Sequence, residues 1–164
     1  MFADTLLTAA AELLDDLRKD GLKLATAESC TGGLIASVLT EIPGSSDIVE
    51  RGFVTYSNAA KSQMLGVSER LLAEHGAVSR EVALAMAEGA LAHSGADVSV
   101  AVTGVAGPGG GSALKPVGLV HFAAARRGAS TLHEEFRFGD IGRAQIRLKS
   151  VEAGLVLIRR AMQL

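Results

Sequence analysis

Residues 25–33, with the sequence ATAESCTGG, constrain the fold of this chain most strongly. The stretch begins as the end of a short apolar strand, breaks at a small, hydroxylated segment, and passes through two glycines into an apolar, helix-like run. A strand that leads directly into a helix places unpaired N–H groups at the carboxyl edge of a sheet. Glycines without Cβ atoms let a ligand approach that backbone closely. The pattern therefore predicts either a ligand-binding turn around Ser29 or a serine/threonine cap on the helix.

Helical and extended patterns alternate along the whole chain. Apolar residues recur at helical spacing in some segments, and β-branched or alternating residues mark others. The patterns predict helices at residues 2–20, 31–41, 58–65, 68–74, 79–94 and 142–162, and strands at residues 22–27, 48–56, 97–102, 117–125 and 130–138. Because the alternation is followed by a late hairpin, we expect an α/β fold, a three-layer α/β/α sandwich with a mixed, mostly parallel sheet. A single domain over residues 1–164 is large enough to bury a core.

The composition limits both the core and the partners. Hydrophobic residues make up 48% of the chain, but only six residues are aromatic (five Phe and one Tyr), so Ala, Val, Leu and Ile must fill the core. The net charge of −2 and the lack of a basic block argue against a nucleic-acid partner. No apolar run approaches the roughly 20 residues that span a membrane. We therefore attribute the mean hydropathy of +0.30 to a subunit interface and expect a homo-oligomer, a dimer or a tetramer.

Cysteine and histidine usage excludes several classes of site. Cys30 is the single cysteine, which rules out an internal disulfide and fits a reducing compartment. The first residues carry acids where a signal peptide would carry bases, so we expect a cytoplasmic protein. The four histidines are scattered, without a pair at ligand spacing, and we expect no metal site. The glycine-rich segment matches neither the Walker pattern nor the dinucleotide pattern, and no cofactor is predicted.

A second feature is the segment YSNAAK at residues 56–61. If Ser57 or Asn58 caps the next helix, Lys61 falls near its positively polarised start, where an ammonium group is disfavoured by about 0.3–1 kcal/mol. The ordinary interpretation is a lysine whose charged end reaches water. The alternative is a general base. Lowering the pKa of a lysine from about 10.4 to about 7–8 takes roughly 4 kcal/mol, most of which burial would have to supply.

The third feature is the loop TGVAGPGGGSALKP at residues 103–116, which carries five glycines at the end of an apolar strand. A hydroxyl and glycine N–H groups at such a place can bind a phosphate or an oxyanion. Three strand ends would bring this loop, Ser29 and Lys61 to one edge of the sheet, where a neutral lysine can activate a serine nucleophile. Cys30 is the rival nucleophile, because a helix start can acidify a thiol.

Five segments in order resemble the CinA C-terminal family: ESCTGG (28–33), GFVTYSNAAK (52–61), GAVS (76–79), TGVAGPGGG (103–111) and KPVGLV (115–120). The resemblance covers roughly residues 5–160, and the chain resembles the stand-alone form of the family. It implies a metal-independent Ser/Lys amidohydrolase, an NMN deamidase, that converts nicotinamide mononucleotide to nicotinate mononucleotide and ammonia in pyridine nucleotide salvage. Because some members are named only as competence- or damage-inducible proteins, the alternative is a non-catalytic nucleotide-binding sensor. A structural or interaction role ranks third.

The resemblance also implies which residues act. Carried over by motif, the nucleophile is Ser29 and the base is Lys61. Tyr56 and Thr103 then fall beside them as supporting hydroxyls, and these four are the expected catalytic residues. The expected partner is a small-molecule nucleotide.

Substrate-binding residues follow from the same segments. The family often has a Gly-Asp-Arg run before its last helix; here Ile141 and Gly142 interrupt it, and Arg143 takes the place of the arginine. Arg147 shares the helical face of Arg143 and is equally well explained as a solvated surface charge. The residues expected to bind substrate are Cys30, Thr31, Gly32, Gly33, Asn58, Gly104, Ala106, Gly107 and Arg143.

Overall fold

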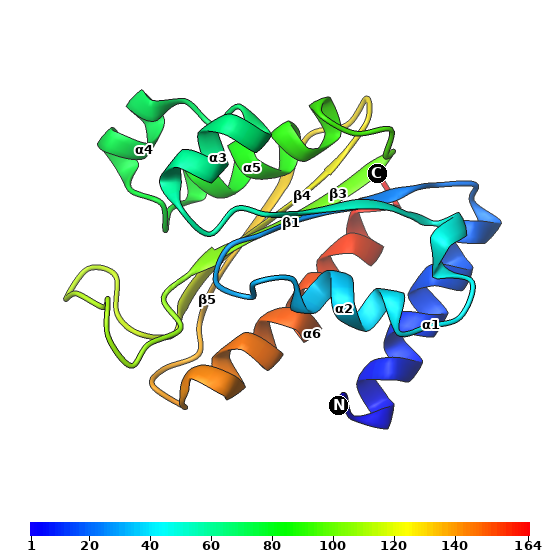
Figure 1. Cartoon of the computed structure of the whole chain (residues 1–164), viewed down its shortest axis with the longest axis horizontal. Helices are drawn as coiled ribbons and strands as arrows, with labels where there is room; N and C mark the ends of the chain where they lie inside the picture. Colours follow the sequence, from blue (N-terminus) through cyan, green and yellow to red (C-terminus); the bar gives the residue numbers. More distant parts are fainter.

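The computed structural model describes all 164 residues, which form six α-helices and five strands (Figure 1). The helices are α1 (Asp4–Lys19), α2 (Leu34–Thr40), α3 (Asn58–Leu65), α4 (Glu69–His75), α5 (Arg80–Ala92) and α6 (Arg143–Ala161), with a short 3₁₀ helix at Ser45–Asp47. The strands are β1 (Leu24–Glu28), β2 (Val49–Val54), β3 (Val98–Gly104), β4 (Leu119–Arg126) and β5 (Leu132–Arg137). Every predicted helix and strand is present, with its ends shifted by a few residues. None of the helices is both long and apolar enough to cross a membrane.

The sheet is mixed, with the strand order β2-β1-β3-β4-β5. β1 pairs in parallel with β2 and with β3, whereas β4 runs antiparallel to both β3 and β5. Because β1, β2 and β3 are neighbours that point the same way, the segments after Glu28, Val54 and Gly104 meet at one edge of the sheet. The mixed sheet and its helical layers confirm the predicted fold class.

Helices cover both faces of the sheet, and strand side chains alternate between two cores. On one face, α1, α2 and α6 pack on branched or aromatic strand residues such as Val100, Val120 and Phe122. Figure 1 shows α3, α4 and α5 together on the opposite face. There the strands present small side chains, which we call the alanine layer: Ala25, Ala27, Ala101, Ala123 and Ala125.

Local sequence signals set the ends of the helices around the site. Ser57, Ser68 and Ser79 each accept a hydrogen bond from the backbone N–H three residues further on, which caps α3, α4 and α5. Gly66 ends α3 with a φ of +69°, a conformation that favours glycine. α2 begins at Leu34, later than predicted, because the two glycines before it adopt φ values of +57° and +98° and form a turn first.

A close approach between helices sets the position of α3. A Cβ atom added to Gly89 of α5 would lie 2.1 Å from the carbonyl oxygen of Leu65, the last residue of α3. Only a residue without a side chain can stand at this contact. The contact therefore keeps α3, which carries Lys61, tightly against α5 and the edge of the sheet.

Candidate active site

Ser29 and Lys61 meet where β1, β2 and β3 end. Ser29 follows β1 directly, and Lys61 projects from the fourth residue of α3. The Lys61 Nζ atom lies 3.0 Å from Ser29 Oγ and 2.8 Å from the carbonyl oxygen of Thr55. Two side chains that are 32 positions apart in the chain are therefore within the distance that a nucleophile and its base require.

The Lys61 side chain is almost completely buried, with 1% of the residue exposed. Its amine contacts a hydroxyl and a carbonyl oxygen, and it forms no ion pair with a carboxylate. Burial lowers the pKa of Lys61, because the ammonium form loses hydration that no counter-ion replaces. In the neutral form, one N–H can donate to the Thr55 carbonyl while the nitrogen lone pair accepts the Ser29 hydroxyl proton.

The turn after Ser29 leads into α2, and the free N–H groups at the start of this helix are bound by a side chain of the protein itself. Glu28 is fully buried, and its carboxylate accepts hydrogen bonds from the N–H groups of Gly33, Ile35 and Ala36 at 3.2, 3.0 and 2.9 Å. A carboxylate here satisfies the unpaired donors of α2 and interacts favourably with the helix dipole. The prediction that Gly33 offers its N–H group to a ligand is therefore wrong.

The Ser29–Lys61 pair opens into a cavity of about 300 Å³, which we call the Ser29 pocket. Its walls come from the segments after β1 and β2, from the glycine-rich loop after β3, and from the start of α6. The site residues predicted from the sequence leave out Ala77 and Val78, which line the pocket from the turn between α4 and α5, although the motif GAVS contains both. The prediction also leaves out Val105, Gly109 and Gly110 of the glycine-rich loop. The predicted residues that line it are Ser29, Cys30, Tyr56, Lys61, Thr103, Gly104, Ala106, Gly107 and Arg143.

Arg143 and Tyr56 lie at the mouth of the Ser29 pocket. Arg143 Nη1 donates a hydrogen bond of 2.9 Å to the carbonyl oxygen of Gly107, and Nη2 donates one of 2.9 Å to the Tyr56 hydroxyl. Tyr56 is 60% exposed, and its hydroxyl is bonded to this guanidinium and to neither Ser29 nor Lys61. The arginine therefore places a positive charge at the opening of the pocket.

Thr103 and Cys30 also line the Ser29 pocket. Thr103 Oγ1 donates to the carbonyl oxygen of Ala77 at 2.8 Å, so its hydroxyl proton is used in this bond and is not available to a ligand. Cys30 is 5% exposed, and burial raises the pKa of its thiol to about 12. A thiol that stays protonated at neutral pH is a poor nucleophile, which favours Ser29 over its neighbour.

Four residues that were expected to bind substrate do not line the Ser29 pocket. Thr31 is fully buried, and its hydroxyl has no hydrogen-bond partner. Gly32 and Gly33 lie in the turn that leads into α2, outside the cavity. Asn58 begins α3 and faces a separate depression between α3 and α4. The structure therefore does not bring these four residues to the Ser29–Lys61 pair.

Arg147 of α6 contacts the site from behind the turn. Its Nε donates to the carbonyl oxygen of Cys30 at 3.1 Å, and its Nη2 donates to that of Thr31 at 3.0 Å. The spacing of four residues from Arg143 was the only sequence signal for this contact. The interpretation of Arg147 as a solvated surface charge is therefore wrong.

Two of the four histidines are in contact, contrary to the expectation that they are scattered. His121 Nδ1 on β4 lies 2.9 Å from His133 Nε2 on β5. The antiparallel register makes the two residues diagonal neighbours, which sequence spacing alone does not reveal. Burial lowers the pKa of both rings. No third His, Cys, Asp or Glu completes a group that could hold a metal ion.

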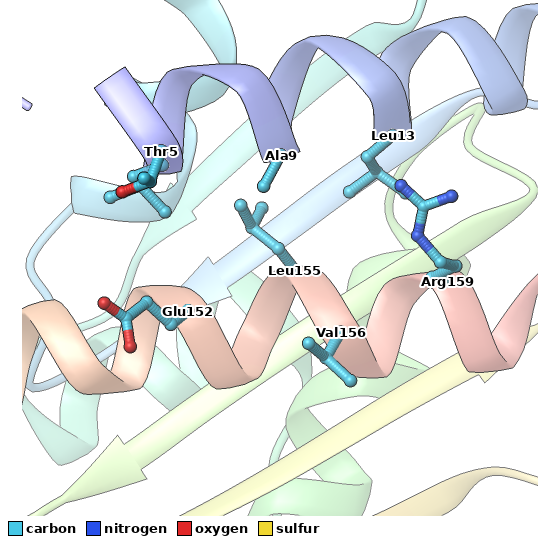
Figure 2. Close-up of a pocket in the computed structure, with 8 residues that line it drawn as sticks. Thr5, Ala9, Leu13, Glu152, Leu155, Val156 and Arg159 are labelled. Atoms are coloured by element: carbon cyan, nitrogen blue, oxygen red, sulfur yellow. The ribbon is translucent and has the colours of Figure 1, made fainter. Parts of the chain in front are cut away.

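A second depression, of about 320 Å³, lies between α1 and α6 (Figure 2). Figure 2 shows Ala9 and Leu155 opposite each other between the two helices, with Glu152 and Arg159 towards either end. The groove is slightly larger than the Ser29 pocket but is mainly apolar and contains no contact between a nucleophile and a base. The Ser29 pocket is therefore the stronger candidate for a functional site.

Known proteins share both sequence and structure with this chain. The sequence matches the family described as CinA C-terminal domain over residues 6–162. A CinA-like protein of Akkermansia muciniphila is 59% identical over 118 residues, which cover 72% of this chain and 28% of that protein. A CinA-like protein of Syntrophobacter fumaroxidans is 50% identical over 146 residues, which cover 89% of this chain and 34% of that protein. The chain thus spans only 28–34% of the length of the curated relatives it matches.

Solved structures extend the similarity over nearly the whole fold. The competence/damage inducible protein CihA from Agrobacterium tumefaciens has a TM-score of 0.96 and 55% identity, with 98% of each chain covered. A CinA superfamily protein from Escherichia coli has a TM-score of 0.89 and 36% identity, with 97% of this chain and 92% of that chain covered. With its sequence match, its fold and the order of its site motifs in agreement, the chain belongs to the CinA C-terminal domain family.

Proposed function

We propose that this protein is a nicotinamide-nucleotide amidohydrolase, which converts nicotinamide mononucleotide and water to nicotinate mononucleotide and ammonia. The observation that carries the proposal is the buried contact of 3.0 Å between Ser29 Oγ and Lys61 Nζ, at an amine without an ion-pair partner. Such a pair supplies the nucleophile and the base of amide hydrolysis in one contact. The names of the relatives refer to competence and damage and specify no substrate, so the choice of substrate rests on the motif resemblance.

The first half of the proposed reaction forms an acyl-enzyme. Ser29 Oγ attacks the carboxamide carbon while neutral Lys61 Nζ takes the hydroxyl proton, and the carboxamide oxygen becomes an oxyanion. The resulting Lys61 ammonium gives this proton to the amide nitrogen. The C–N bond then breaks, ammonia leaves, and an ester joins Ser29 Oγ to the nicotinoyl carbon.

Water completes the reaction. Its oxygen attacks the ester carbon while Lys61 takes one of its protons, and the C–O bond to Ser29 breaks as the proton passes to Ser29 Oγ. The product acid loses its remaining proton to solvent. Throughout both halves, the Thr55 carbonyl accepts a hydrogen bond from the Lys61 amine and so helps to hold the amine beside the reacting groups.

The mouth of the Ser29 pocket suits the phosphate of the substrate. Arg143 uses two N–H groups in its bonds to Tyr56 and Gly107, and a guanidinium carries five. The backbone N–H groups of Ala106 and Gly107 donate to no acceptor within the protein. Charge-assisted bonds from these donors would hold a phosphate. The cavity of about 300 Å³ is at the lower end of the range for small-molecule sites.

The test is direct. Purified protein is incubated with nicotinamide mononucleotide and a chelator, and both ammonia and nicotinate mononucleotide are measured. We expect the two products in equal amounts, with no loss of rate from the chelator and none of either product from Ser29→Ala. Tight binding of the mononucleotide by an inactive wild-type protein would overturn the proposal and favour a nucleotide-binding sensor.

A further inference from the structure

The turn after β1 leaves two backbone N–H groups without an acceptor. The N–H groups of Ser29, Gly32 and Gly33 donate to protein oxygens at 2.9, 3.0 and 3.2 Å. Those of Cys30 and Thr31 donate to no protein oxygen. Backbone N–H groups away from water are almost always paired. Of the two unpaired groups, only the N–H of Cys30 belongs to a residue that lines the Ser29 pocket.

The free N–H group of Cys30 has the position of an oxyanion donor. Cys30 follows Ser29 directly and lines the Ser29 pocket. On other folds that carry a serine nucleophile after a strand, the N–H of the next residue stabilises the negative oxygen of the tetrahedral intermediate. Such a donor accelerates the reaction only if it is already directed at the place where charge develops.

Two charged side chains hold this turn from opposite ends. Arg147 donates through Nε and Nη2 to the carbonyl oxygens of Cys30 and Thr31 at 3.1 and 3.0 Å, and it forms no ion pair. Within a planar trans peptide group, the carbonyl oxygen and the following N–H point in opposite directions. The Thr31 carbonyl that Arg147 binds shares its peptide group with the Gly32 N–H, which donates to the Ser29 carbonyl at 3.0 Å. The Ser29 carbonyl in turn shares its peptide group with the Cys30 N–H, so the bond to Arg147 helps to fix the direction of that donor. At the other end, the buried Glu28 carboxylate holds the Gly33 N–H.

We infer that Arg147 is a positioning residue for the oxyanion donor of the turn, the Cys30 N–H, a deepening that rests on the proposed amidohydrolase function. Arg147 does not contact the reacting atoms. Its two hydrogen bonds fix the peptide groups that follow Cys30 and, through the bond between the Gly32 N–H and the Ser29 carbonyl, the peptide group that carries the Cys30 N–H. The Ser29–Lys61 contact uses none of these bonds, so we expect it to remain in a variant that lacks Arg147.

The inference predicts a change in kcat and not in KM. Removal of a whole oxyanion donor typically lowers kcat by about 10²–10³. Loss of Arg147, which only positions a donor, should have a smaller effect and lower kcat by roughly 10- to 100-fold. The KM for the mononucleotide should stay within about twofold of the wild-type value. If Arg147 instead bound the phosphate of the substrate, its loss would mainly raise KM.

The first experiment compares Arg147→Ala, Arg147→Lys and Lys149→Ala by steady-state kinetics with nicotinamide mononucleotide. Lys149 is the matched control, because it lies on the same helix and its side chain bonds only to Glu152. We expect a low kcat for Arg147→Ala, partial recovery in Arg147→Lys, which can still donate to a carbonyl, and wild-type constants for Lys149→Ala. Circular dichroism shows whether each variant is folded. If Arg147→Ala is unfolded, the kcat and KM of Arg147→Lys test the inference instead. A raised KM with normal kcat, or wild-type constants throughout, would overturn the inference.

A second experiment separates the inference from the choice of substrate. p-Nitrophenyl acetate acylates an activated serine and needs the oxyanion donors but no nucleotide. The acetylated Ser29 peptide is followed by mass spectrometry. If the wild-type protein is acetylated at Ser29 but does not hydrolyse the mononucleotide, the proposed function fails. In that case, slower acetylation of Arg147→Ala, by roughly 10- to 100-fold, still supports the inference. Equal rates in the two proteins, or no acetylation of the wild type, would overturn it.

Discussion

Arg143 Nη2 donates a hydrogen bond of 2.9 Å to the Tyr56 hydroxyl and so joins the first residue of α6 to the segment after β2. The same guanidinium bonds to Gly107 in the glycine-rich loop. Three segments that are far apart in the chain therefore share one positive charge at the mouth of the Ser29 pocket. We therefore expect recognition of an anionic substrate to depend most on Arg143.

Arg143→Ala should raise the KM for nicotinamide mononucleotide at least tenfold, because charge-assisted hydrogen bonds contribute roughly 1.5–3 kcal/mol. The matched control is Tyr56→Phe, which removes the hydroxyl that Arg143 contacts but keeps the charge, and it should change KM much less. Steady-state kinetics with nicotinamide riboside, which lacks the phosphate, complete the test. Equal losses of kcat/KM for the nucleotide and the riboside would show that Arg143 does not recognise the phosphate.

Ser29→Ala should abolish ammonia release while the protein stays folded, since the hydroxyl caps no helix and contacts only the Lys61 amine. Cys30→Ala should retain most of the wild-type kcat. Burial raises the pKa of the Cys30 thiol to about 12, so only about one molecule in 10⁴ carries the thiolate at pH 8. Activity in Ser29→Ala, or its complete loss in Cys30→Ala alone, would move the nucleophile to the neighbouring residue.

The rate should rise with pH, because the neutral amine of Lys61 is the active form. Burial lowers the pKa of Lys61 from its ordinary value, so the rise should lie below the pH at which a free lysine titrates. Lys61→Arg should be as damaging as Lys61→Ala, since a guanidinium does not release its proton. A profile of kcat against pH checks this, and a Lys61→Arg enzyme with much of its rate would contradict the role of a base.

Lys61→Met should stabilise the fold. An unfolded chain keeps the lysine proton to about pH 10.5, whereas the folded chain releases it at a lower pH. The free energy of unfolding therefore rises with pH between the two pKa values and is lowest below the folded pKa, where burial forces a charge into the interior. Methionine fills similar space without an amine, so we expect a gain of about 1–3 kcal/mol, largest at low pH. Urea denaturation at several pH values measures it, and an unchanged or lowered stability at acid pH would refute the expectation.

The protein should form a homo-oligomer in solution. Large apolar side chains remain exposed on this chain, including Val54, Leu114 and Val156. Val156 also borders the mainly apolar groove between α1 and α6, and apolar surface of this kind is commonly covered by association. Light scattering at micromolar concentration should give a multiple of 16.9 kDa, and a mass near 16.9 kDa itself would contradict the prediction.

The meeting of Ser29 and Lys61 was predictable because it depends on chain topology. Each residue follows a strand, and parallel neighbours end at the same edge of a sheet whatever the details of packing. Capping serines and glycines likewise marked the helix ends, so Ser57 indicated where α3 begins and how far along it Lys61 lies. These signals are local in sequence and need no knowledge of which side chains touch.

The contacts around that pair were not predictable, because they depend on the directions of individual side chains. Glu28 follows the predicted strand at residues 22–27, and nothing in the sequence indicates that its carboxylate accepts hydrogen bonds from the first N–H groups of α2. Arg147 contacts a turn more than a hundred residues earlier in the chain. This contact depends on how α6 packs against the sheet, which the sequence pattern does not reveal. His121 and His133 meet only through the register of a hairpin.

The alanine layer limits which amino-acid substitutions the protein can accept on that face of the sheet. An alanine has no rotamer to adjust, and a close-packed interior has no space to absorb a larger replacement. Any added carbon on that face pushes α5 outward, and the contact at Gly89 carries α3, and with it the Lys61 amine, away from Ser29. On the opposite face, a larger branched side chain at one position can be compensated by a smaller one at a neighbouring position. Neutral substitutions should therefore accumulate on the side of α1, α2 and α6, while the side of α3, α4 and α5 stays nearly invariant for as long as the serine–lysine contact is under selection.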